Sequence, residues 1–157
     1  MLPIRVLACV ASGVLLMQLV SAQAPDDKHP SLPDGPGKAA LLKACGECHG
    51  PESAVAQLKT HDEWSKTLDD MAANGAHATD EEWTEILAYL DKHFSLVLVN
   101  TADAKQLAVA LDVSEPEADA IVHYRAEHGR FAGIDDVKLV PGVDAAKIDA
   151  GKDRFVF

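Results

Sequence analysis

The residues of this chain best suited to chemistry are two thiols and an imidazole that lie within five positions. Cys45 and Cys48 are separated by two residues, and His49 follows directly. Two cysteines at this spacing can add to the two vinyl groups of one haem as thioethers, and the histidine after them is then delivered beneath the iron as an axial ligand. The spacing therefore predicts one covalent haem c, held by Cys45 and Cys48 with His49 on the iron.

Two other uses of the motif are open. A redox dithiol of the thioredoxin type needs a strand before it and a helix after it, whereas residues 38–44 have a helical pattern and a Gly-Pro pair follows the motif. A zinc site needs two further ligands, and the remaining cysteine, Cys9, lies in a segment that we expect to be removed. Both explain the motif less well than haem attachment does.

Residues 1–24 have the pattern of a secretory signal peptide. Arg5 supplies a short basic region, an apolar run follows over 6–20, and residues 22–24 form an A-x-A cleavage site. The apolar run is too short for a transmembrane helix. We therefore expect a mature chain that is periplasmic or secreted. Residues 25–37 hold four of the eight prolines and predict a disordered, Pro-rich linker.

A haem iron with one histidine ligand either takes a second ligand or keeps an open site. Met71 is the only methionine after residue 24, and it continues an apolar stripe over 64–71 on a predicted helix. We therefore predict that the thioether of Met71 is the second axial ligand. His77 or His61 would give a bis-histidine site instead.

Residues 38–96 resemble small monohaem cytochromes c. Beyond the haem motif, the likeness is carried by the run 64–76 (WSKTLDDMAANGA), by 81–83 (EEW) and by 86–90 (ILAYL). The family pattern has its methionine ligand at the place of Met71. The resemblance implies an all-α chain that begins with a minimal three- to four-helix cytochrome c domain over 38–96.

Residues 97–157 resemble the helix-hairpin-helix domain of the competence-type DNA receptors (ComEA-like). That fold pairs two helical hairpins, and in its DNA-binding members each hairpin carries a Gly-apolar-Gly turn whose amides contact a phosphate. Here the first turn has Asp112 and Ser114 at the glycine places, and the second keeps Gly142 but has Asp144. The likeness is carried by 99–102, Leu107, 120–125, 129–131, 135–137 and 140–143.

These departures and the charge argue against DNA binding. An acid at the phosphate position repels the ligand, and a side chain there blocks the amides. Residues 97–157 carry 11 acidic and 7 basic side chains, a net charge of −4, whereas a nucleic-acid module is expected to be basic. We therefore expect the DNA site, of which Gly142 is the remnant, to be lost, and the module to dock proteins rather than nucleic acid.

The sequence as a whole predicts an exported monohaem c-type cytochrome that transfers electrons and is not an enzyme. Because the chain has 25 acidic against 14 basic residues, its redox partner protein should have a basic docking surface. A second hypothesis is a DNA-binding or DNA-uptake protein that acts through the helix-hairpin-helix domain, with the haem as an accessory. A third is haem-based catalysis or sensing at an open iron site.

Overall fold

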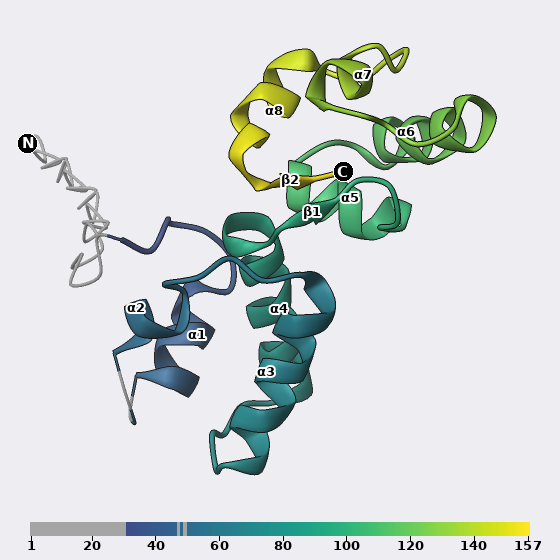
Figure 1. Cartoon of the computed structure of the whole chain (residues 1–157). Helices are drawn as coiled ribbons and strands as arrows, with labels where there is room; N and C mark the ends of the chain where they lie inside the picture. Colours follow the sequence, from purple (N-terminus) through teal and green to yellow (C-terminus); the bar gives the residue numbers. More distant parts are fainter. Residues whose placement is uncertain (1–30, 47, 49) are drawn as a thin grey trace, which may run out of the picture.

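The computed structural model describes residues 31–46, 48 and 50–157. The predicted signal peptide, part of the predicted linker and His49 lie outside this part of the chain. The described residues form two mainly helical lobes, each with its own buried core (Figure 1). We call residues 31–96 the N-terminal lobe and residues 97–157 the C-terminal lobe. The expectation of a mainly helical chain is confirmed.

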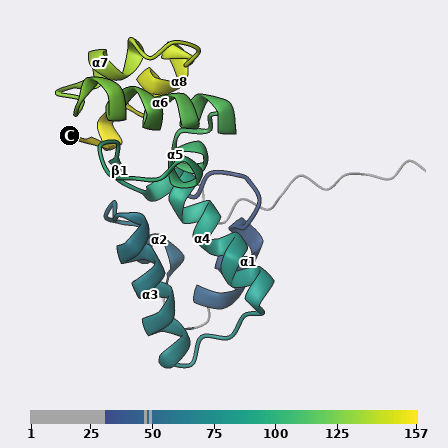
Figure 2. The same cartoon turned by 90° about the vertical axis from the view of Figure 1, so that its right-hand side faces the viewer.

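The N-terminal lobe is built around two long helices that lie side by side (Figures 1 and 2). Both begin with a capping box, a pattern that can be read from the sequence, since the hydroxyls of Thr60 and Thr79 accept hydrogen bonds from the amides of Glu63 and Glu82. A short helix starts at Pro51, where we had expected only a break. The helices are α1 (Lys38–Cys45), α2 (Pro51–Ala54), α3 (His61–Ala73) and α4 (Asp80–Phe94).

The apolar stripes of α3 and α4 meet in the core of this lobe. Trp64 and Ile86 are almost completely buried there, together with Leu41 of α1. The indole N–H of Trp64 donates to the carbonyl of Phe94 at 3.1 Å, which satisfies the one polar group of that side chain. Trp64 is therefore a structural core residue.

Residues 31–37 do not form the disordered tether that we predicted, because they pack on α4. Leu32 is 2% exposed, and the hydroxyl of Tyr89 donates to the carbonyl of Pro33 at 2.7 Å. Gly37 has φ +89° and lies so close to α4 that an added Cβ would come within 2.4 Å of the Glu85 carbonyl oxygen. The burial of Leu32 and the hydrogen bond to Pro33 place this stretch against the N-terminal lobe, although its prolines and acids are typical of a disordered linker.

The C-terminal lobe consists of two helical hairpins (Figure 1). The first hairpin is α5 (Ala104–Leu111) and α6 (Glu115–His128), and the second is α7 (Ile134–Lys138) and α8 (Ala145–Ala150). We call residues 112–114 the first turn and residues 139–144 the second turn. A 3-10 turn (Lys152–Arg154) follows α8.

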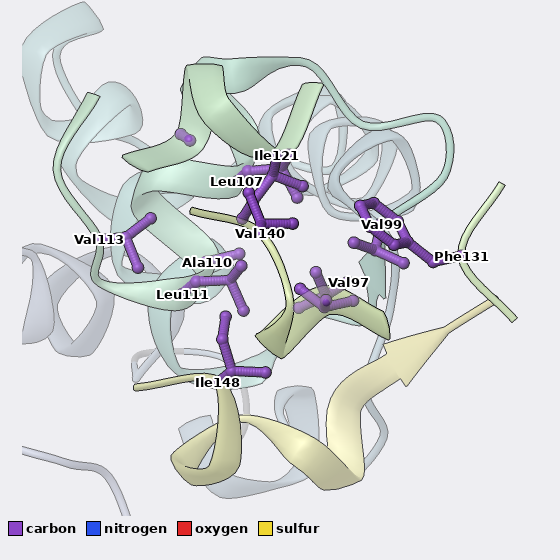
Figure 3. Close-up of a cluster of buried hydrophobic side chains, with 12 residues drawn as sticks. Val97, Val99, Leu107, Ala110, Leu111, Val113, Ile121, Phe131, Val140 and Ile148 are labelled. Carbon is purple, nitrogen blue, oxygen red and sulfur yellow. The ribbon is translucent and has the colours of Figure 1, made fainter. Parts of the chain in front are cut away.

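Apolar side chains from both hairpins fill the core of this lobe, among them Leu107, Ile121 and Ile148 (Figure 3). A parallel two-stranded sheet, which the all-α expectation missed, closes one side of it: β1 (Val97–Leu98) pairs with β2 (Phe155–Val156). The N-cap of α5 is Asp103, whose side chain accepts a hydrogen bond from the Gln106 amide. The sheet brings the two ends of the lobe together.

The two lobes meet where α4 is followed by the C-terminal lobe (Figure 2). The guanidinium of Arg154 donates to the carbonyls of Lys92 (3.0 Å), Ser95 (3.4 Å) and Ala110. Ser95 is buried, and its hydroxyl donates to the carboxylate of Asp91 at 3.1 Å. One arginine near the C-terminus therefore joins the last turns of α4 and α5.

Among the residues that the structure describes, none of the helices combines the length and the apolar character needed to cross a bilayer.

Candidate functional site

The first turn keeps the backbone of a hairpin turn although it holds no glycine. Asp112 has φ 55° and ψ 39°, a left-handed conformation that glycine, asparagine and aspartate adopt more readily than other residues. Its amide donates to the carbonyls of Ala108 and Val109, which ends α5. Ser114 then caps α6 through its hydroxyl. The first turn therefore differs from the Gly-apolar-Gly pattern in its side chains and keeps the left-handed backbone conformation at Asp112.

The second turn exposes backbone donors. Gly142 has φ +86°, is exposed, and has no atom within 4 Å of the position where a Cβ would lie. Asp144 caps α8 by accepting a hydrogen bond from the Ala146 amide at 2.8 Å. In the described part of the chain, the amides of Gly142 and Ala145 make no hydrogen bond within the protein. This turn can therefore offer N–H groups to an anion.

The acids at the two turns are paired within the protein. Asp112 accepts a hydrogen bond from the Lys92 ammonium at 2.9 Å, which lowers the pKa of Asp112. Glu117 accepts hydrogen bonds from Ser114 and from the Asp144 amide, and these bonds lower the pKa of Glu117 to about 2. The net charge of −4 that we counted over this segment therefore overstates the repulsion that a phosphate meets at the turns.

The structure places two of the predicted haem residues on one cavity of the N-terminal lobe. Cys45, the last residue of α1, and Met71 of α3 both line a cavity of about 280 Å³, together with Leu41, Trp64, Leu68 and Leu90. Burial raises the pKa of the Cys45 thiol, and so does the charge of the nearby Cys48. Cys48 is exposed. His49 lies outside the described residues.

The alternative iron ligands are not placed on this cavity. Taken over the described residues, its lining includes Met71 but neither His61 nor His77. The Nδ1 atom of His61 lies 2.8 Å from a carboxylate oxygen of Asp91, which is buried. Within the same described part, there is no group of three or more His, Cys, Asp and Glu side chains that could hold a metal ion.

Comparison with known proteins identifies the C-terminal part. The family model of the helix-hairpin-helix motif matches residues 92–156. Residues 92–156 form a helix-hairpin-helix domain. The two hairpins and their left-handed turn residues, Asp112 and Gly142, are the structural counterpart of that match.

Several curated proteins are similar to part of the chain. A protein of Haemophilus influenzae is 33% identical over 60 residues, which are 38% of this chain and 54% of that protein. Endonuclease/exonuclease/phosphatase family domain-containing protein 1 of Rattus norvegicus is 42% identical over 53 residues, 34% of this chain and 9% of that protein. ComE operon protein 1 of Bacillus subtilis is 41% identical over 49 residues, 31% of this chain and 24% of that protein. The chain thus spans about half of the first relative and far less of the others.

No solved structure matches the chain.

These matches overturn our main functional prediction. The helix-hairpin-helix domain and the similarity to ComE operon protein 1 favour DNA binding or uptake over an electron-carrying cytochrome with a basic redox partner. The expectation that nucleic acid is not a partner is wrong for the same reason. The prediction was wrong for two reasons. The short haem motif says less about function than the longer C-terminal pattern does, and acids such as Asp112 are paired rather than bare charges.

The sequence analysis missed two residues that shape this domain, Glu117 and Lys92. Glu117 could have been found, because Ser114-x-x-Glu117 is a capping-box pattern that predicts a carboxylate folded back on the turn. Its bond to the Asp144 amide joins residues that are 27 positions apart, and no local pattern indicates it. The pairing of Lys92 with Asp112 likewise depends on how the two lobes pack.

Proposed function

We propose that this chain is an exported, non-enzymatic DNA-binding protein that holds duplex DNA by its backbone through the two turns of the helix-hairpin-helix domain. The observation that carries the proposal is the match of residues 92–156 to the helix-hairpin-helix motif, together with the left-handed residues Asp112 and Gly142 that keep both turns in shape. The similarity to ComE operon protein 1 supports a role in DNA uptake. The predicted signal peptide over 1–24 would deliver the protein to the periplasm or the cell exterior.

The chemistry of the second turn fits a phosphate oxygen. Gly142 leaves space for the DNA backbone to approach, and its own amide and that of Ala145 are available as donors within the described structure. Lys147 lies one helical turn further on and is 40% exposed, so it can add a charge to the same phosphate. Contacts of this kind read the backbone and not the bases, so we expect binding without sequence preference.

The first turn contributes less. The side chains of Asp112 and Ser114 stand where the resemblance places glycine, and the Asp112 carboxylate is exposed even though Lys92 neutralises it. Together with the acidic surface, this predicts modest affinity that falls steeply as salt is added. Experiments therefore belong at low ionic strength.

The test is fluorescence anisotropy with a short labelled duplex, comparing Gly142→Ala with Gly129→Ala. Both glycines have positive φ, +86° and +92°, and neither has an atom within 4 Å of an added Cβ, so each alanine strains the backbone without a steric clash. Only Gly142 lies at a turn. Loss of one hydrogen bond to a phosphate predicts about tenfold weaker binding for Gly142→Ala and no comparable loss for Gly129→Ala.

Two results would refute the proposal. One is the absence of duplex binding by the folded wild-type chain at low salt. The other is an equal effect of the two alanine variants, which would mean that the second turn does not touch the DNA. A randomised and an unrelated duplex should bind with similar affinity, since backbone contacts dominate.

We also propose that the N-terminal lobe carries a covalent haem through Cys45 and Cys48, as an accessory to DNA binding. The cavity supports this fit, because the Cys45 thiol and the Met71 thioether line the same apolar space. Cys45 and Cys48 would attach the group, and His49 and Met71 would bind its iron. When bound, the group would supply a redox-active iron. The chain's own part is to enclose the ring among apolar side chains such as Leu68 and Leu90.

Mass spectrometry and an absorption spectrum of protein made with haem-attachment machinery test this second proposal. We expect an added mass of one haem and a Soret band in the wild type, and neither in a Cys45→Ser, Cys48→Ser double variant. Wild-type protein with the bare polypeptide mass would refute haem attachment. That result would leave the DNA-binding proposal untouched, because the two proposals depend on different lobes.

A further inference from the structure

One carboxylate joins the two turns of the helix-hairpin-helix domain. The Oε2 atom of Glu117 accepts hydrogen bonds from the Ser114 amide at 2.8 Å and from the Ser114 hydroxyl at 2.7 Å. Its Oε1 atom accepts one from the Asp144 amide, on the other hairpin, at 3.2 Å. The ammonium of Lys147 lies 3.8 Å from Oε2. Donors from both hairpins therefore converge on a single anion.

These are the donors that proteins use to hold a phosphate. Backbone amides, serine hydroxyls and lysine ammonium groups are among the donors that proteins use to contact phosphate oxygens. A carboxylate resembles a phosphodiester in carrying one negative charge over two oxygens that accept hydrogen bonds. The Glu117 side chain is only 17% exposed, so it is held within this cluster and does not swing freely in solvent. The strong lowering of its pKa, to about 2, has its cause in the same donors.

We propose that Glu117 is an internal anion that occupies these donors in the free protein and thereby sets the affinity of the domain for duplex DNA. The inference rests on the proposed DNA-binding function. A phosphate that reaches both turns takes the place of the carboxylate, and Ser114, Asp144 and Lys147 exchange one anion for another. Because the protein gives up its own hydrogen bonds in this exchange, the net gain is small and binding is readily reversed.

A neighbouring acid provides the control. Glu115 lies in the same first turn of α6 and is exposed. Its side chain makes no hydrogen bond or ion pair in the described part of the chain. Glu115→Gln and Glu117→Gln remove the same charge at almost the same distance from the turns. Only Glu117→Gln weakens the hold on the Ser114 and Asp144 donors. A difference between the two variants therefore measures occupancy of the donors rather than overall charge.

The experiment uses the full chain and a short labelled duplex at low ionic strength, with affinities from anisotropy. We expect Glu117→Gln to bind roughly fivefold more tightly than the wild type, and Glu115→Gln to gain less than about twofold because its charge is exposed and screened. In the free proteins, circular dichroism should show both variants folded. Thermal unfolding should show Glu117→Gln alone to be destabilised, since a glutamine amide has one acceptor oxygen and cannot keep the hydrogen bonds from both Ser114 and Asp144.

The possible outcomes distinguish the role proposed for Glu117 from the proposed DNA binding of the wild-type chain. If the wild type binds and Glu117→Gln binds no more tightly than Glu115→Gln, the inference is overturned and DNA binding stands. If Glu117→Gln binds and the wild type does not, the inference is supported and the proposed function of the wild type fails. If no protein binds, both fail.

A variant that does not fold would not end the test. The amide resonances of Ser114 and Asp144 can be followed by nuclear magnetic resonance while duplex is added to the wild type. Shifts at these two amides that exceed the shift at Glu115 support the exchange of anions. Unchanged resonances at saturating duplex overturn it.

Discussion

Arg154 offers the sharpest test of how the two lobes hold together. Its guanidinium donates to carbonyls of Lys92, Ser95 and Ala110, at the ends of two different helices. Arg154→Ala removes these donors and leaves carbonyl groups at the lobe boundary without partners. The two shorter bonds, to Lys92 and Ala110, contribute about 1.5 kcal/mol each at the low end of the range for a charged donor, so we expect a loss of about 3 kcal/mol in the free energy of unfolding, or about 6–12 °C in Tm.

Two probes can locate that loss. The chain has two tryptophans, Trp64 and Trp83, and both are in the N-terminal lobe, so their fluorescence reports on this lobe while circular dichroism reports on both. In urea the two signals should change together in the wild type and separately in Arg154→Ala. The control is Arg130→Ala, because Arg130 is exposed and makes no hydrogen bond in the described structure. A loss below about 1 kcal/mol with coincident transitions would refute the role given to Arg154.

Three further predictions concern single side chains. In protein made without haem, iodoacetamide should modify exposed Cys48 well before buried Cys45. Burial raises the pKa of the Cys45 thiol, so this thiol should react only at higher pH. Equal modification rates by mass spectrometry would contradict the described burial. Glu117 has a folded pKa of about 2 against about 4.3 unfolded, so its stabilising effect should be complete above about pH 4.3 and be lost as the pH falls toward 2. Urea midpoints should therefore fall less steeply with acid in Glu117→Gln, and equal slopes would count against the bridge. Asp112→Gly keeps the left-handed turn and frees Lys92, so duplex affinity measured by anisotropy should rise; a fall would mean that the ion pair shapes the turn.

Local patterns in the sequence predicted local structure well. The capping boxes at Thr60 and Thr79 place two helices because the signal, a hydroxyl and a carboxylate three residues apart, acts within one turn. The disorder predicted for residues 31–37 was wrong, because Leu32 is buried in the core of the N-terminal lobe and the carbonyl of Pro33 accepts a hydrogen bond from Tyr89, 56 positions away. Composition alone cannot indicate such contacts. Order in that segment comes from tertiary packing.

The candidate site was predicted in part. The turn residues Asp112, Ser114, Gly142 and Asp144 could be named from the resemblance, but their consequences depended on partners that are distant in sequence. Net charge predicted repulsion of DNA, whereas the structure pairs Asp112 with Lys92 and folds Glu117 back onto amides. Counting charges describes long-range attraction and says little about the donors at one turn.

The way α4 runs into the C-terminal lobe has a geometric consequence. The connection is short. Arg154 donates a hydrogen bond to the Lys92 carbonyl of α4, and the Lys92 ammonium donates one to Asp112 of the first turn. The two lobes are thus in direct contact and are not joined by a free linker. We expect these contacts to hold the two turns at a constant distance from the cavity beside Cys45, so a pair of spin labels placed at the two ends should report a single narrow distance.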